Sequence, residues 1–152
     1  MRLQSSVVIR RKPDEVWSFL TDPLNIPRWD RGVAAVEVNQ SSPRGAGLEF
    51  TTVGQPGSGP DRGRMTYRVT EAGPQKMDCR AALTSRTGNA RSVRAAAWRQ
   101  QVEDTPPGLR VTISVEFRLR FCYFWLAPLL FVFGNSAHKK DLRHLQDVLE
   151  KS

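Results

Sequence analysis

Near its N-terminus the chain reads VVIRRKPDEVWSFLTDPLNIPRW (residues 7–29), and this stretch sets the order of the first elements. Residues 3–10, which overlap the start of this stretch, predict a first strand. Pro13, Asp14 and Glu15 then predict the start of a short helix, because proline suits the first helical turn and acidic side chains interact favourably with the helix N-terminus. The Asp22-Pro23 step ends that helix, and residues 24–29 predict a second short helical segment.

The middle of the chain predicts a series of antiparallel strands. Between residues 33 and 120, segments of alternating polarity are separated by turns rich in Gly, Pro, Asn and Asp. The most regular segment places Val111, Ile113 and Val115 on one face and polar side chains on the other. The six segments span residues 33–39, 47–53, 62–71, 75–84, 91–103 and 109–120.

The C-terminal segment, residues 127–150, predicts a long amphipathic helix with Pro128 in its first turn. The apolar side chains in this helix and just before it are mostly spaced three or four apart: Leu126, Leu130, Phe133, Ala137, Leu142, Leu145, Val148 and Leu149. The whole order predicts an α+β helix-grip fold in one domain, residues 1–152. In this fold a curved seven-stranded antiparallel sheet wraps around a long C-terminal helix, and two short helices follow the first strand.

Several short motifs resemble those of a known family. Pro13, Val16-Trp17, Asp22-Pro23 and the Pro27-Arg28-Trp29 step are similar to the N-terminal signature of the START-like, Bet v 1-like (SRPBCC) superfamily, above all its polyketide cyclase/dehydrase and lipid-transport branch. Later stretches that resemble it are GAGLEF (45–50), RVTEAGP (68–74) and LRHLQDVLEKS (142–152). One departure is Lys12, where members of the family often carry another proline. The resemblance covers nearly the whole chain and implies a ligand cavity between the sheet and the long helix.

Composition and charge exclude other classes of protein. With 39% apolar and 25% charged residues and only two cysteines, the 152-residue chain is neither a collagen, a low-complexity chain nor a disulfide scaffold. No signal-peptide core is visible, and the most apolar stretch, residues 121–133, is shorter than the ~20 residues that span a bilayer. We therefore expect a cytoplasmic protein. His138 and His144 lack a third partner for a metal site, so we expect no metal and no cofactor.

Alternation also predicts which side chains face the cavity. The inner set is almost wholly apolar and suits an apolar or aromatic ligand. The alternative is that the same side chains fill a solid core. The predicted ligand-binding residues are Trp17, Trp29, Met65, Tyr67, Cys79, Trp98, Ile113, Val115, Phe117, Leu130, Phe133 and Ala137.

Few polar side chains are placed to carry out chemistry in such a cavity. Tyr67 is the predicted catalytic residue, because a buried phenol can polarise an oxygen of the ligand, although it can equally be a core residue. His138 and Asp141 form a second candidate, with a surface pair as the alternative. Arg64 or Arg94 would reach the cavity only if the strand register slips by one residue. Cys79 is expected to be a buried structural thiol.

Three functions remain open on the sequence alone. The first is a carrier or chaperone that binds a lipid, polyketide, isoprenoid or aromatic molecule. The second, implied by the family resemblance, is a polyketide cyclase/dehydratase that promotes aldol cyclisation and dehydration in the same cavity. The third is a non-catalytic interaction partner with a filled core, which would show an exposed apolar patch.

The net charge of +8 is compatible with an anionic partner. Arg118 and Arg120 precede the apolar tract 121–133, and Lys139 and Lys140 follow it, which suggests peripheral contact with an anionic membrane. Burial of the tract between helix and sheet is the alternative. Nucleic acid is not expected as a partner, because the aromatic side chains fall on the face away from the arginines.

Overall fold

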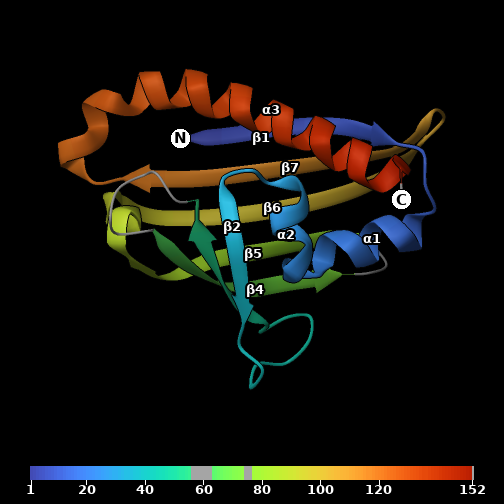
Figure 1. Cartoon of the computed structure of the whole chain (residues 1–152), viewed down its shortest axis with the longest axis horizontal. Helices are drawn as coiled ribbons and strands as arrows, with labels where there is room; N and C mark the ends of the chain where they lie inside the picture. The colour runs from blue at the N-terminus through green and yellow to red at the C-terminus, as the bar shows by residue number, and fades with distance from the viewer. Residues whose placement is uncertain (56–62, 74–76, 152) are drawn as a thin grey trace.

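The computed structural model describes residues 1–55, 63–73 and 77–151 (Figure 1). Within these residues the strands are β1 (Arg2–Ile9), β2 (Val33–Val38), β3 (Glu49–Gly54), β4 (Arg64–Gly73), β5 (Asp78–Thr87), β6 (Val93–Thr105) and β7 (Gly108–Leu119). The α-helices are α1 (Pro13–Thr21), α2 (Ile26–Trp29) and α3 (Ala127–Lys151). Three short 3₁₀ turns accompany them, η1 (Pro23–Asn25), η2 (Gly88–Ser92) and η3 (Phe121–Leu126). The predicted order of elements is confirmed, with η2 and η3 as additions.

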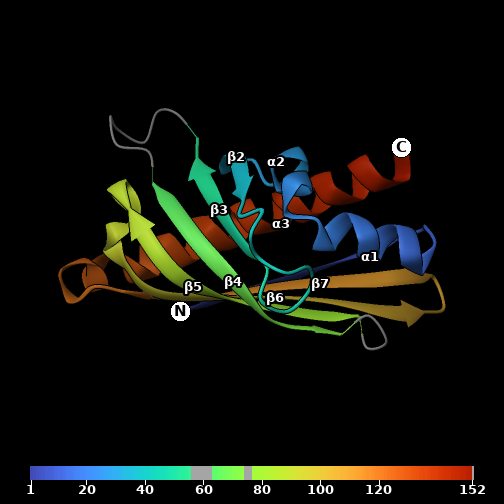
Figure 2. The same cartoon turned by 90° about the horizontal axis from the view of Figure 1, so that it is seen from below.

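The described strands form one antiparallel sheet in the order β1-β7-β6-β5-β4-β3-β2. The first strand in the sequence pairs with the last, so that Leu3 lies opposite Val115. Figure 2 shows α1, α2 and α3 on one side of the curved sheet. This arrangement is the predicted helix-grip architecture, and it leaves the inner face of the sheet directed at α3.

The short helices after β1 form for the local reasons that the sequence provides. Pro13 occupies the start of α1, with Asp14 in the first turn, and the helix buries Val16 and Leu20. Asp22 then accepts a hydrogen bond at Oδ1 from the backbone N–H of Leu24 at 3.0 Å, which caps η1. The chain therefore turns within a few residues, and α2 packs next to β2 of the sheet.

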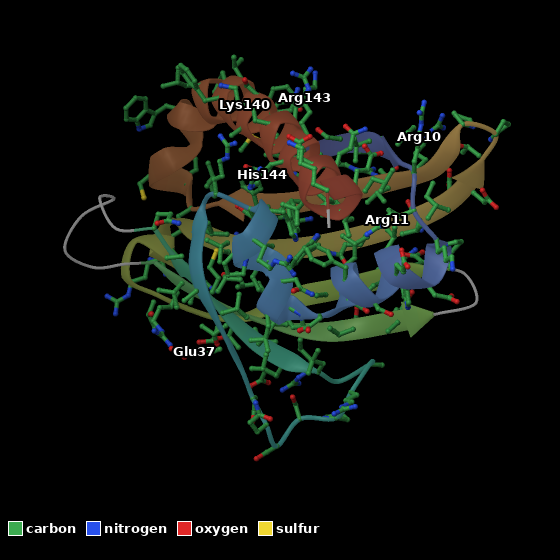
Figure 3. The ribbon with its side chains drawn as sticks, turned by 45° about the vertical axis from the view of Figure 1, so that its right-hand side comes forward. Arg10, Arg11, Glu37, Lys140, Arg143 and His144 are labelled. Carbon is green, nitrogen blue, oxygen red and sulfur yellow. The ribbon has the colours of Figure 1, made fainter. Side chains whose placement is uncertain are left out.

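The C-terminal half of α3 supplies the helix side of the core. Leu142, Leu145 and Leu149 are buried in one cluster with side chains of β1, α1, β6 and β7. The guanidinium of Arg11 donates from Nε to the carbonyl oxygen of Leu149 at 2.9 Å, and Figure 3 shows Arg10 and Arg11 beside this end of the helix. Hydrophobic burial and this cap together hold the end of α3 against the sheet.

The N-terminal half of α3, unlike the C-terminal half, leaves large apolar side chains exposed. Gly134 lies so close to β1 that an added Cβ would come within 3.1 Å of Leu3 Cδ1, so the helix backbone approaches the sheet there. Phe133, however, is 66% exposed, and Ala137 is exposed as well. The prediction that these two side chains face the sheet is therefore wrong. Within the described residues, no helix is long and apolar enough to cross a membrane.

Candidate functional site

An open cavity of about 370 Å³ lies between the sheet, α2 and α3. This volume is within the range of ~300–1,000 Å³ that is usual for small-molecule sites. Its lining residues come from every layer of the fold: Ile26, Trp29, Asp30, Gly32, Val33, Thr52, Gly54, Gly63, Met65, Tyr67, Ala90, Trp98, Ile113, Val115 and His138. A hollow of about 30 Å³ adjoins it and shares Ile26 and Trp98 with it.

Aromatic rings form much of the wall. Trp98 of β6 is central, with its ring centroid 6.4 Å from that of Trp29 and 6.4 Å from that of Tyr67. Phe50 stacks on Tyr67 at 5.6 Å and meets Trp98 edge-on at 6.1 Å. Such offset and edge-to-face pairs stabilise one another beyond their burial. Trp29, Tyr67 and Trp98 therefore form an aromatic wall of the cavity, whereas Phe50 lines the adjoining hollow.

Two donors in this wall have unused hydrogen-bonding capacity. The hydroxyl of Tyr67 reaches the sulfur of Met65 at 3.7 Å, and thioether sulfur is a weak acceptor. The indole N–H of Trp98 is buried and has no acceptor among the described residues. A buried donor without a partner costs free energy, which an oxygen of a bound ligand would recover.

Asp30 is the acidic group of the cavity, and it follows directly after α2. Burial raises the pKa of Asp30 to about 6, and the negative charge of Asp141 adds to the effect. The backbone N–H of Gly32 donates to Asp30 Oδ1 at 2.8 Å and lowers the pKa, as does the positive charge of His138. Asp30 therefore holds a carboxyl that exchanges its proton near neutral pH.

His138 brings a second titratable group from α3. Its Nε2 lies 2.9 Å from the carbonyl oxygen of Ile113 on β7. Since a carbonyl oxygen only accepts, Nε2 carries the proton and Nδ1 remains to accept or donate. Asp141, one turn further along α3, accepts at Oδ1 from the backbone N–H of Arg31 at 3.4 Å. Partial burial raises the pKa of Asp141, while His138 and Arg31 lower it.

Tyr67 remains a neutral phenol in this surrounding. Burial, with a smaller contribution from the charge of Asp30, raises the pKa of Tyr67 to about 12. The site therefore combines a carboxyl, an imidazole and a phenol on an otherwise apolar wall. Such a combination can orient an oxygen-bearing apolar molecule and can move a proton to or from it.

The structure brings half of the predicted ligand-binding residues to the cavity, namely Trp29, Met65, Tyr67, Trp98, Ile113 and Val115. Cys79 lines the adjoining hollow instead. Trp17 packs against the main core cluster, and Phe117 packs against a second cluster and borders a separate surface hollow beside Met1. Neither of them lines the cavity. The side chain of Leu130 lies outside the described residues.

The other polar candidates are also placed. Arg64 pairs with Glu37 on the outer side of the sheet, and Arg94 is exposed, so neither reaches the cavity. His138 lines the cavity, which decides against the surface-pair alternative for this residue. Asp30, Val33, Thr52 and Ala90 were not predicted. The position of Asp30 between Trp29 and Gly32, at a turn that follows an inward aromatic, is the signal that would have indicated it.

Within residues 1–55, 63–73 and 77–151, no three His, Cys, Asp or Glu side chains gather closely enough to hold a metal ion. Asp30, His138 and Asp141 influence one another electrostatically, but the site shows no arrangement of metal ligands.

Solved structures with the same architecture are numerous, and three are representative. TTHA0849 from Thermus thermophilus is 14% identical and superposes with a TM-score of 0.78 over 97% of this chain and 95% of its own. A START superfamily protein from Mycobacterium smegmatis is 10% identical, with a TM-score of 0.77 over 99% and 97% of the two chains. The Zhui aromatase/cyclase from Streptomyces sp. R1128 is 11% identical, with a TM-score of 0.73 over 99% and 92%. At these identities the likeness shows the fold alone.

No curated protein sequence matches the chain significantly. A family model does match, over residues 1–150, and it is described as polyketide cyclase / dehydrase and lipid transport. This match covers both the helical signature near the N-terminus and the long C-terminal helix. The chain therefore belongs to the polyketide cyclase / dehydrase and lipid transport family, within the START-like (SRPBCC) superfamily.

Proposed function

We propose that the chain binds a small hydrophobic molecule, with at least one hydrogen-bond-accepting oxygen, in the cavity beneath α3 and acts as its carrier or chaperone. The observation that carries this proposal is the aromatic wall with two underused donors, Tyr67 O–H and Trp98 N–H. Burial of apolar ligand surface supplies the affinity, at about 25 cal/mol per Å². The two donors select for a carbonyl or hydroxyl oxygen.

A direct test starts from the freshly purified protein. Native mass spectrometry should show an apolar molecule bound at one copy per chain, and organic extraction should identify its class. The binding preference is then measured with two probes of the same shape, 2-acetylnaphthalene and 2-ethylnaphthalene, which differ by a carbonyl oxygen. Quenching of tryptophan fluorescence reports binding of each probe.

Variants separate the contribution of the donors from that of the wall. Tyr67→Phe and Trp98→Phe should each weaken binding of 2-acetylnaphthalene by about 2–12-fold, the equivalent of one net hydrogen bond. Binding of 2-ethylnaphthalene should change little. If the purified protein holds no small molecule and binds neither probe, the proposal fails. If both probes bind and neither substitution weakens binding of 2-acetylnaphthalene more than binding of 2-ethylnaphthalene, the donors have no role in selection.

A second function is favoured by Asp30, whose pKa of about 6 suits general acid–base catalysis. In a cyclase, the Asp30 carboxylate would take a proton from a CH₂ group between two ketones. The enolate carbon would then bond to another carbonyl carbon, whose oxygen accepts a hydrogen bond from Tyr67 and takes up the proton that Asp30 had removed. Loss of that hydroxyl with a neighbouring C–H proton releases water and forms a double bond. Incubation with a poly-β-ketone thioester mimic tests this, since Asp30→Asn should abolish cyclisation while binding persists.

A further inference from the structure

Apolar side chains gather on the outside of η3 and the first turns of α3. Phe121 is 94% exposed and Trp125 75% exposed, and the exposed set continues along the helix. Among the side chains that the structure describes, Leu24 is the one other large hydrophobic residue that is exposed. Soluble proteins rarely expose so continuous an apolar segment without a binding partner. We call this segment the apolar end, and its residues are Phe121, Trp125, Leu129, Phe131, Val132 and Phe133.

Positive charge borders the apolar end on both sides. Arg118 and Arg120 are exposed at the end of β7, and Lys139 and Lys140 are exposed on α3 after it. Residues 117–140 contain no Asp or Glu, so no acidic side chain of this segment offsets these four charges. Figure 3 shows Lys140 on α3, with Arg143 on the same helix. An apolar surface framed by cations complements an anionic lipid bilayer, where acyl chains meet the apolar groups and headgroups meet the charges.

The same charges argue against a second copy of this chain as the partner. Two copies that met through their apolar ends would bring the four cations of each chain toward those of the other. Like charges at an interface oppose association unless acidic groups compensate for them. The segment itself provides none.

The indole N–H of Trp125 already has an acceptor within the chain, which suits the side chain to an apolar medium. Its indole N–H donates to the carbonyl oxygen of Cys122 at 3.0 Å, so the ring can leave water without an unpaired donor. Tryptophan is enriched at the boundary between headgroups and acyl chains. Since no described helix is both long and apolar enough to span a bilayer, the apolar end would lie at the membrane surface.

We propose that the apolar end docks the chain on a membrane that contains anionic lipids, with Phe121 and Trp125 inserted and the four cations on the headgroups. Figures 1 and 2 both place the start of α3 at the same end of the molecule as η2, whose Ala90 lines the cavity. Docking therefore turns this end of the cavity toward the bilayer. The proposal goes beyond ligand binding and does not depend on which molecule the cavity holds.

Vesicle flotation tests the docking. The wild-type protein should float with vesicles of 70% phosphatidylcholine and 30% phosphatidylglycerol at 50 mM NaCl. With phosphatidylcholine alone, or at 500 mM NaCl, binding should be at least tenfold weaker because the headgroup attraction is absent or screened. Lipids brominated on the acyl chains should quench fluorescence in the wild type, and Trp125→Phe should remove that quenching.

Matched variants identify the surface. Phe121→Ser with Trp125→Ser should weaken binding at least tenfold, whereas Leu24→Ser, an exposed apolar residue on η1, should leave it unchanged. Arg118→Gln with Arg120→Gln should weaken binding about 30-fold. Arg10→Gln with Arg110→Gln removes the same net charge elsewhere and should change binding less than twofold. Circular dichroism confirms that each variant is folded.

Two results would overturn the proposal. One is wild-type binding that does not depend on phosphatidylglycerol or salt, or that survives in the Phe121→Ser, Trp125→Ser variant. The other is absence of vesicle binding together with a dimer in sedimentation that this variant abolishes, which would assign the surface to a second copy of the chain. Neither result bears on ligand binding in the cavity, which the naphthalene probes measure separately.

Discussion

The Nε2 nitrogen of His138 on α3 lies 2.9 Å from the carbonyl oxygen of Ile113 on β7. This hydrogen bond joins the helix to the sheet at the cavity and places the imidazole where its charge acts on Asp30. Asp30 and His138, which are 108 positions apart in the sequence, are thereby coupled electrostatically.

The first prediction concerns this coupling. The positive charge of His138 lowers the pKa of Asp30, and the negative charge of Asp141 raises it. His138→Gln keeps a donor near Ile113 but removes the charge, so the pKa of Asp30 should rise above about 6. Asp141→Asn should lower it. Carboxyl ¹³C titration by NMR measures both shifts, and shifts of the same sign in the two variants would contradict the arrangement.

The second prediction is a pH dependence of stability. Because the pKa of Asp30 is raised from 3.8 to about 6 in the folded chain, the folded state binds this proton more tightly than the unfolded state does. The contribution of this group to stability is therefore fully present only well below the unfolded pKa of 3.8, and it is lost as the pH rises from there through about 6.

Asp30→Asn removes this dependence. At pH 8 the variant should be more stable than wild type by about 2–3 kcal/mol, from about two pKa units at ~1.4 kcal/mol each. At pH 4 the difference should fall to about 0.5 kcal/mol, because the carboxyl of the unfolded chain is still partly ionised there. Urea denaturation at the two pH values measures it, and Asp147→Asn, which changes an exposed carboxylate on α3, is the control. An equal difference at pH 4 and pH 8 would refute the assignment.

The third prediction contrasts the two halves of α3. Leu145 is fully buried in the core, so Leu145→Ala should lower the free energy of unfolding by about 2–5 kcal/mol. Phe133→Ala removes a larger side chain that is mostly exposed, and should change stability by less than about 0.5 kcal/mol. Urea denaturation compares the two. Similar losses in both variants would place Phe133 in the core after all.

The fourth prediction concerns the two free cysteines. Burial, with a smaller contribution from Asp78, raises the pKa of Cys79 to about 11, so very little thiolate is present at pH 8. Cys122 is exposed. Iodoacetamide should therefore label the Cys79→Ser variant rapidly and the Cys122→Ser variant slowly. Equal rates in the two folded variants would show that Cys79 is accessible and ionised.

The sequence predicted the local elements and the inner faces of several strands. Met65 and Tyr67 of β4, and Ile113 and Val115 of β7, all line the cavity as alternation required. Alternation succeeds here because a strand has two faces, and one apolar side chain in the pattern assigns the rest. Pro13 and Asp22 likewise marked their helix boundaries, because capping depends on residues a few positions apart.

The rotation of the first turns of α3 did not follow from the sequence in the same way. Residues 126–133 are almost entirely apolar, so this segment has no polar face from which to decide which side is buried. The structure turns Phe133 and Ala137 outward and Gly134 toward Leu3, because the glycine lets the helix backbone approach the sheet.

The sequence by itself therefore determined what depends on neighbours along the chain: the order of elements, the strand faces and the helix boundaries. The tertiary structure alone decided which polar groups meet, since Asp30 follows a short helix near the N-terminus while His138 and Asp141 lie on the last helix. They come together because α3 packs against α2, and the backbone N–H of Arg31, just after α2, donates to Asp141. Electrostatic coupling depends on distance in space, and the pattern of a single segment contains no information about that distance.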